Sequence, residues 1–250
     1  MDETLKLLMN HRSVREYDSN KNVSEEQVDT IVKAAMSAPN WINGQQVTVI
    51  EVRDNERKST LAKAAGNQKY IEEAPVFLVF CIDFYRAKLA AEKHGKDLRV
   101  VEDMESILVG STDVGIALGS AVVAAESMSL GTVPIGGIRR NSNTFVELLE
   151  LPEYVFPVAG LLIGYPRTIP AQKPRLPQQA THMKERYDVQ KQKEAIPKYD
   201  DTFASYMYER TNGKDASDWS TKVANFYEHG FEAYEKSTSP TLKKQGFRYK

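Results

Sequence analysis

A short basic segment near the N-terminus is the first feature that could do chemistry. Its sequence, HRSVR, places His11, Arg12 and Arg15 close together beside the hydroxyl of Ser13. Like charges this close repel each other, and a bound anion relieves the repulsion. Arginine suits phosphate because its planar fork donates two parallel hydrogen bonds. The segment is therefore either a phosphate-binding turn or a solvated basic turn, and these five residues alone do not separate the two.

Further cations and hydrogen-bond donors are spread along the chain. Each has an ordinary explanation as a polar loop, a strand exit or a solvated surface. Together they describe a ligand with a phosphate at one end and a flat, hydrogen-bonding ring at the other. They are Asn40, Asn43 and Gln45 in one loop, Gln68 after Gly66, the Gly136-Gly137 pair, and Lys173 with Arg175.

The common hydrolytic and nucleotide-binding motifs are absent from the sequence. There is no Gly-x-Ser-x-Gly nucleophile elbow, no phosphate-binding P-loop and no Gly-x-Gly-x-x-Gly turn. The single cysteine, Cys81, lies inside an apolar run and excludes an internal disulfide. The four histidines lack metal-ligand spacing. We therefore expect no metal site and no side-chain nucleophile.

The bulk composition is that of an ordinary soluble protein. The chain has 250 residues, 41% hydrophobic and 27% charged, with a net charge of −1. This balance gives no electrostatic reason to bind nucleic acid. The N-terminal apolar run is too short and too charged for a signal peptide. We expect a cytoplasmic protein without nucleic-acid or membrane partners. Residues 107–136 are apolar but interrupted by Asp113 and Glu126, which favours a helix in the core or in a dimer interface.

Helices and apolar strands alternate along the chain, which indicates a mixed α and β fold. Residues 84–106 are predicted to form an exposed excursion that would suit a lid, and 166–177 a stiff Pro-rich segment. The aromatic-rich tail is predicted to pack on another surface. Helices are expected over 2–10, 24–38, 55–65, 107–130, 145–151 and 217–234, and strands over 46–53, 75–82 and 155–164, with a further strand ending in a Gly-Gly turn at 133–137.

Several motifs, in order and over nearly the whole chain, resemble the nitroreductase/flavin-reductase superfamily. The nearest branch is that of oxygen-insensitive, NADPH-dependent nitroreductases and NADPH–FMN oxidoreductases. The motifs are HRSVREY (11–17), the 38–46 loop, GNQKYIEEAP (66–75), AAESMSLGTVPIGGIR (124–139), GLLIGYP (160–166) and KPRLP (173–177).

The resemblance implies an α+β nitroreductase-like fold with a central, mostly antiparallel sheet flanked by helices. It also implies an obligate homodimer with exchanged C-terminal arms and an FMN at each subunit interface. The chain would be a single domain, 1–250. Residues 166–250 would form an extended Pro-rich loop and an arm that packs on the core and on the partner subunit.

The resemblance also assigns roles to residues. His11, Arg12, Ser13, Lys173 and Arg175 would surround the FMN phosphate and ribityl chain, and Arg15 the pyrimidine side of the ring. Asn40, Gln45 and Gln68 would hydrogen-bond the ring and ribityl, and Ile135, Gly136 and Gly137 would bring backbone N–H groups to it. Arg210 and Lys214 would bind the NADPH 2′-phosphate.

Two departures from the family pattern affect specificity. Trp41 replaces part of a Ser-rich loop and would narrow the pocket or stack on a ring. Asp215 follows Lys214 where a basic cluster is expected, which weakens the preference for NADPH over NADH.

The implied activity is a ping-pong transfer of two electrons from NADPH, through tightly bound FMN, to nitroaromatics, quinones or free flavin. The cofactor carries the chemistry, so no catalytic side chain is required, and Arg15 acts electrostatically. Three alternatives stay open: an FMN store or sensor with little turnover, a superfamily member with a different flavin reaction, and an interaction module whose basic turn binds phosphate nonspecifically.

Overall fold

The computed structural model describes residues 2–249, whose contacts divide the chain into two compact units. Unit 1 comprises the described residues up to Pro170 and those from Ala233 onward, and unit 2 comprises Ala171–Glu232. The expectation of a single domain with an arm at 166–250 stays a prediction.

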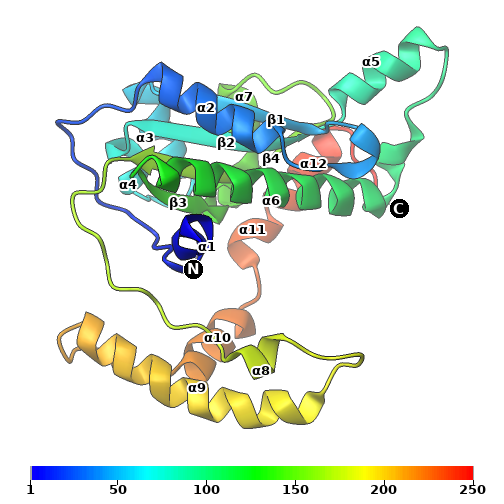
Figure 1. Cartoon of the computed structure of the whole chain (residues 1–250). Helices are drawn as coiled ribbons and strands as arrows, with labels where there is room; N and C mark the ends of the chain where they lie inside the picture. The colour runs from blue at the N-terminus through cyan, green and yellow to red at the C-terminus, as the bar shows by residue number, and fades with distance from the viewer. Residues whose placement is uncertain (1, 250) are drawn as a thin grey trace. The chain divides into compact units, whose positions relative to one another are not determined.

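Unit 1 is built on a four-stranded antiparallel sheet (Figure 1). The strands are β1 (Val47–Val52), β2 (Val76–Asp83), β3 (Gly131–Ile135) and β4 (Val155–Gly164), in the order β1-β2-β4-β3. The register pairs Val49 with Phe80, Val79 with Gly160, and Val133 with Leu162. This arrangement confirms the predicted α+β fold with an antiparallel sheet flanked by helices.

Strand β2 explains why helices cover both faces of the sheet. All eight of its residues are buried, and successive side chains point to opposite faces. Leu78 and Phe80 join a core with α2 (Glu25–Met36) and α6 (Met104–Ser127). Phe77 and Val79 join a second core with α3 (Asn55–Ala64), α4 (Tyr70–Glu73) and α7 (Ser142–Leu148). The strand predicted over 75–82 is therefore confirmed, and it is a central strand of the sheet.

Helix α6 has one buried and one uncovered face. Val114, Ala117 and Ala121 are buried, and a Cβ at Gly110 would lie 2.7 Å from Ile82. Among residues 2–249, α6 is the one helix long and apolar enough to cross a membrane by length and composition. Only 28% of its most apolar window is buried. The helix predicted for the core or a dimer interface therefore buries one face within the chain and leaves a second face available to another surface.

The other elements of unit 1 are short. They lie in the N-terminal segment, in the loop before β1, in the 84–106 segment, after β3 and near the C-terminus. Within the 84–106 segment Phe84, Val101 and Ser106 are buried, whereas α5 has no fully buried residue. The elements are α1 (Glu3–Met9), η1 (Trp41–Asn43), α5 (Tyr85–Lys93), η2 (Arg99–Glu102), η3 (Gly136–Asn141) and α12 (Thr238–Lys244).

Unit 2 consists of α8 (Gln178–Thr181), α9 (Val189–Arg210) and α10 (Trp219–Glu228), and α11 (Glu232–Glu235) begins at its last residue. Asp218 caps α10 by accepting from the Thr221 N–H at 2.7 Å. The single helix predicted over 217–234 is wrong, because α10 ends at Glu228 and Gly230 has a φ of +57°. A left-handed residue breaks the helical hydrogen bonding there.

The strand end predicted before Gly136-Gly137 is confirmed, but the turn expected at the two glycines is wrong. Strand β3 ends at Ile135, and the two glycines begin the 3₁₀ helix η3. Neither is among the described glycines with positive φ. Crowding explains Gly137 instead, since a Cβ there would lie 2.1 Å from the Gln68 amide nitrogen and 2.7 Å from the Ala65 carbonyl oxygen.

Candidate functional site

The basic N-terminal segment lies along the start of β3. Ser13 pairs with Thr132 in a parallel bridge, and the Val14 N–H donates to the Thr132 carbonyl at 2.8 Å. Gly131 permits this approach, because a Cβ on it would lie 2.8 Å from the Val14 side chain. The backbone of residues 11–15 is therefore fixed to the strand that leads into Ile135, Gly136 and Gly137.

A carboxylate on α6 fixes the imidazole of His11. His11 Nδ1 lies 2.7 Å from Glu126 Oε1, and the same oxygen accepts from the Thr132 hydroxyl at 2.8 Å. Engaging Nδ1 leaves Nε2 for another partner. Arg12 folds back to donate to the carbonyl and side chain of Asn10. Glu126 had appeared in the sequence only as an interruption of an apolar stretch, with no local pattern linking it to residue 11.

Arg15 lies in a second group of side chains. Its guanidinium carbon is 5.8 Å from the centre of the Tyr70 ring, and it has no ion pair among residues 2–249. The Tyr70 hydroxyl donates to Gln68 Oε1, and Gln68 Nε2 donates to the Ala65 carbonyl at 2.7 Å. Gly137 lies against that amide. The structure thus brings together Arg15, Gln68 and Gly137, three of the predicted site residues.

Tyr70 contacts both Arg15 and Gln68, and sequence reasoning missed it, although its position two residues after Gln68 was a usable signal. Its short helix α4 is held by a buried lysine. Lys58 Nζ donates to the carbonyls of Ala74 at 2.6 Å and Glu72 at 3.2 Å. Burial lowers the pKa of Lys58. A cation at the C-terminal end of a helix is favourable, and here it fixes the helix that begins with Tyr70.

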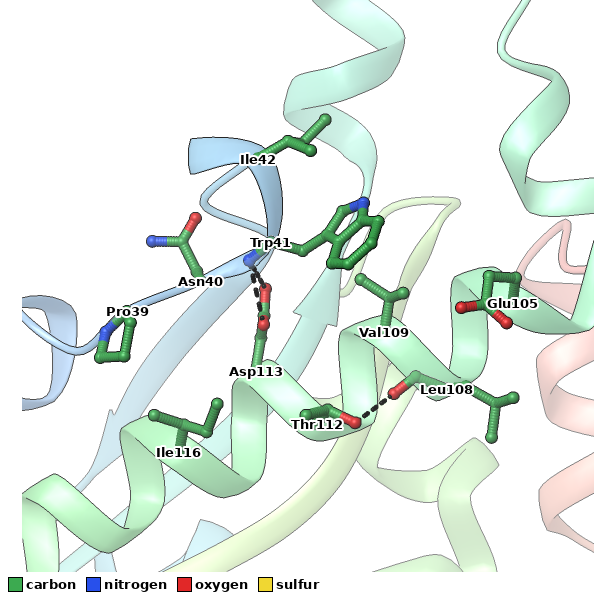
Figure 2. A pocket seen from close by; sticks show the side chains of 10 residues that line it. All are labelled: Pro39, Asn40, Trp41, Ile42, Glu105, Leu108, Val109, Thr112, Asp113 and Ile116. Carbon is green, nitrogen blue, oxygen red and sulfur yellow. Dashed lines mark hydrogen bonds between the residues drawn. The ribbon is translucent and has the colours of Figure 1, made fainter.

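The loop that contains Asn40, Asn43 and Gln45 forms a separate group around Asp113 of α6 (Figure 2). The Trp41 N–H donates to the Asp113 carboxylate at 3.2 Å, and Gln46 Nε2 donates to it at 2.8 Å. Asn40 Oδ1 accepts from the Gln45 N–H at 3.0 Å. Burial raises the pKa of Asp113, and the Trp41 N–H opposes that rise. Asn40 and Gln45 are therefore brought together, in a loop that α6 anchors.

The two groups of unit 1 are far apart within one chain. Asp113 and Glu126 are 13 positions apart on α6, which separates them by about 20 Å along the axis at 1.5 Å per residue. The Asn40–Gln45 loop contacts α6 at Asp113, and His11 contacts α6 at Glu126. One chain does not bring these two groups of predicted residues to a common point.

The remaining predicted cations lie in unit 2. Arg175 Nη1 donates to the Lys173 carbonyl at 2.8 Å, and the Tyr199 hydroxyl donates to the Pro174 carbonyl at 2.8 Å. Lys173 and Arg175 line a cavity of about 470 Å³ with Tyr206 of α9. The Pro-rich segment is thus tied to α9 and presents both cations to a hollow.

Arg210, at the end of α9, stacks on an aromatic ring, with its guanidinium carbon 5.9 Å from the centre of Tyr206. Asp215 is engaged elsewhere: it accepts from Lys222 at 2.8 Å and from the N–H and hydroxyl of Ser217. These donors hold the pKa of Asp215 well below its usual range. Its negative charge is balanced within the 211–222 region, so it opposes Arg210 less than the sequence implied.

Other chemistry finds little support among the described residues. Cys81 is fully buried in β2, and burial raises the pKa of its thiol. The part of the chain that the structure describes contains no group of three or more His, Cys, Asp or Glu that could hold a metal ion. What the described residues offer instead is hydrogen-bond donors and cations, in two separate groups of unit 1 and in unit 2.

Family models match nearly the whole chain. The nitroreductase family matches residues 8–165, and the nitroreductase family C-terminal domain matches residues 173–250. The chain therefore belongs to the nitroreductase family.

Individual relatives match this chain over 99% or more of their length. The chain is 49% identical to an FMN reductase [NAD(P)H] of Bacillus subtilis over 250 residues, 99% of each chain. Its structure resembles that of NfrA2 from B. megaterium, with a TM-score of 0.96, 50% identity and complete coverage of both chains. It also resembles an NADPH:FMN oxidoreductase from Vibrio harveyi complexed with NAD+, with a TM-score of 0.88, 32% identity and complete coverage of both chains.

The neighbouring glycines of η3 provide a matched test of the site geometry. Gly137→Ala should lower the free energy of unfolding by about 1–3 kcal/mol, because its methyl group overlaps the Gln68 amide and the Ala65 carbonyl. Gly136→Ala should change it by less than about 0.5 kcal/mol, since its Cβ would meet only the end of Arg139 at 3.5 Å. Urea titration measures both, and equal losses would contradict the proposed crowding.

Proposed function

We propose that the chain is an FMN-dependent oxidoreductase that passes two electrons from NADPH, or from NADH, to nitroaromatics, quinones or free flavin by a ping-pong mechanism. Family membership and the names of its relatives support this activity. The observation that carries it is the group around Arg15 in unit 1. The Arg15 guanidinium has no ion pair among residues 2–249 and lies against the Tyr70 ring. Tyr70 in turn holds the Gln68 amide, which lies against Gly137.

The residues present fit FMN. Its phosphate requires cations and N–H or O–H donors, which His11, Arg12 and Ser13 provide on a backbone fixed to β3. Its flat ring requires donors and an open approach. Gln68 supplies an amide, and Gly136 is exposed, since a Cβ added to it would meet only the end of Arg139 within 4 Å. We propose Lys173 and Arg175 as further phosphate ligands.

Bound FMN would supply the redox chemistry between the nicotinamide and the acceptor. The chain's own residues would bind and orient the cofactor. Arg15 places a fixed positive charge beside the site, which favours the gain of electrons there. Tyr70 holds that guanidinium by cation–π contact and holds the Gln68 amide by its hydroxyl. No nucleophile or general base is needed, and the single cysteine lies in the core.

The outer face of α6 supports a homodimer. Gly115 and Gly119 would have no neighbour within 4 Å of a Cβ, so no contact within the chain requires glycine there. Leu108 and Ile116 on the same helix are exposed, 56% and 38%. Glycines four positions apart allow a second helix to approach closely. We propose that two copies pair along this face and that residues 166–250 extend as an arm onto the partner.

Such a dimer also resolves the separation between the two groups of site residues. A two-fold axis between Gly115 and Gly119 turns one α6 end for end against the other. The Leu108–Asp113 part of one copy then approaches the Glu126 end of its partner. In the proposed site, Asn40 and Gln45 of the partner subunit therefore complete the ring contacts, while Arg15 and Gln68 come from the first chain.

We further propose that Arg210 and Lys214 bind the 2′-phosphate of NADPH. Arg210 has a preset orientation on Tyr206, and Asp215 is neutralised by Lys222. The single, buried cysteine fits a reducing, cytoplasmic setting.

The proposed function is tested first by spectroscopy. Protein reconstituted with FMN should show a flavin spectrum that bleaches anaerobically with NADPH and returns on adding a quinone. Arg15→Ala should weaken FMN binding about tenfold or more, because it removes a charged partner. Arg57→Ala, an exposed arginine of α3, is the control. A flavin that binds but does not bleach would instead indicate a store or sensor, and a colourless protein would overturn the proposal.

Arg210→Ala tests the donor site. It should raise KM for NADPH about tenfold or more and leave KM for NADH within about twofold, since only NADPH carries the 2′-phosphate. Steady-state kinetics with both donors measures this. Lys198→Ala, an exposed cation on the same helix, should change neither. Equal increases for the two donors would remove Arg210 from phosphate recognition.

A pair of substitutions at one position tests the dimer face. Gly115→Leu and Gly115→Ala both improve helix propensity, but only leucine adds bulk to the outer face. We expect Gly115→Leu to raise the dimer dissociation constant about tenfold or more and to weaken FMN binding, while Gly115→Ala stays dimeric. Analytical ultracentrifugation measures both. A Gly115→Leu protein as dimeric as the wild type would place the interface elsewhere.

A further inference from the structure

The loop before β1 holds an unfavourable backbone conformation. Ile42, Asn43 and Gln45 have φ values of +47°, +57° and +50°. Left-handed φ costs about 1–2 kcal/mol for a residue with a Cβ, and it is rarest for β-branched side chains such as isoleucine. Ile42 is 83% exposed, so packing does not compensate for the strain. Contacts at the flanks of the loop must hold it.

Asp113 supplies the contact that spans the strained residues. Its carboxylate accepts from the Trp41 N–H before them and from Gln46 Nε2 after them. Gly44 lies against the Gln46 amide, where a Cβ would be 2.2 Å from Oε1, so the orientation of that amide is also fixed. Figure 2 shows the Asp113 side chain rising from α6 toward the Trp41 backbone. Arg86 donates a further hydrogen bond to the Gln45 carbonyl, which holds the loop only on the side toward β1.

The surroundings of Asp113 are unusual for a carboxylate. It is 4% exposed and has no ion pair among the described residues. A buried carboxylate without a cation is costly, and its polar partners here are the two loop donors. Replacing Asp113 by an apolar residue would remove its bonds to both sides of the loop.

Trp41 is the side chain that this anchor places. Its indole lines a cavity of about 440 Å³ together with Leu108, Val109 and Ile116 of α6 (Figure 2), so this cavity opens on the α6 face proposed above to meet the partner subunit. The ring is 58% exposed, so its orientation depends on the backbone more than on packing. Asn40 precedes it, and its side chain is bonded to the Gln45 N–H.

We propose that Asp113 is a positioning residue for acceptor selection: through the Trp41 N–H and Gln46 it holds the loop so that the Trp41 indole walls the acceptor pocket. The inference rests on the proposed function and deepens it. Loss of the anchor lets the indole move and admits larger aromatic acceptors. The effect of Asp113 on selectivity must therefore pass through Trp41.

The test compares kcat/KM for 1,4-benzoquinone and the three-ring anthraquinone-2-sulfonate in FMN-loaded protein. Asp113→Asn should shift the ratio toward the larger acceptor about fivefold or more, and Trp41→Ala should do the same. Adding Asp113→Asn to Trp41→Ala should change the ratio less than about twofold, because the two act as one unit. Gln46→Glu combined with Asp113→Asn restores complementary donors and acceptors and should recover the wild-type ratio.

Val114→Ala is the structural control. Val114 is buried beside Asp113 in α6 but belongs to the core, so its truncation lowers Tm without touching the loop. It should leave the acceptor ratio unchanged. A ratio altered as much by Val114→Ala as by Asp113→Asn, or an Asp113→Asn effect that persists in full without Trp41, would overturn the proposal.

A second readout does not depend on activity. The chain has two tryptophans, so Trp219→Phe leaves Trp41 as the sole indole emitter. In that background Asp113→Asn should shorten the local rotational correlation time of Trp41 in fluorescence anisotropy decay, in apo protein, and Val114→Ala should not. Unchanged decay would overturn the anchor. If the anisotropy decay changes as expected but the wild type reduces neither quinone, the proposed function is refuted while the role of Asp113 in holding the loop is supported.

Discussion

The fixed spacing of two carboxylates on one helix determines where the loops of the candidate site lie. Asp113 and Glu126 project from α6, whose inner face is buried against the sheet and whose register is therefore fixed. Asp113 holds the Trp41 backbone, and Glu126 holds the His11 imidazole. The rise of an α-helix sets about 20 Å between the two anchors. Neither loop can move along the core without breaking its bond to α6.

The two anchors differ in chemistry, and the difference matches what each holds. Glu126 meets an imidazole and a hydroxyl at the edge of the core. Asp113 meets neutral donors, and its burial raises its pKa. Its bonds stabilise a loop with three left-handed residues. Strain of that kind persists only where surrounding contacts over-determine it, and such places are commonly functional.

Local signals in the sequence predicted much of the fold. The apolar run before Asp83 identified β2, and the helix predicted over 24–38 corresponds to α2, which Ser24 caps. Long-range contacts were not visible. Asp113 looked like a mere interruption of an apolar stretch, because Trp41 and Gln46 are 72 and 67 positions away. The Gly-Gly turn was wrong for a related reason: Gly137 is required by the Gln68 amide, a neighbour in space, and by no local backbone conformation.

The uncovered face of α6 connects these anchors to assembly. In the proposed dimer, each site takes one group of residues from each chain, so neither monomer alone offers the full set of contacts to FMN. A ligand that binds only the assembled state stabilises that state by mass action. Cofactor affinity and dimer affinity are then linked quantities, and each strengthens the other. The apolar, glycine-containing outer face of α6 would thus serve cofactor retention as well as assembly, which accounts for a helix that is only partly buried within its own chain.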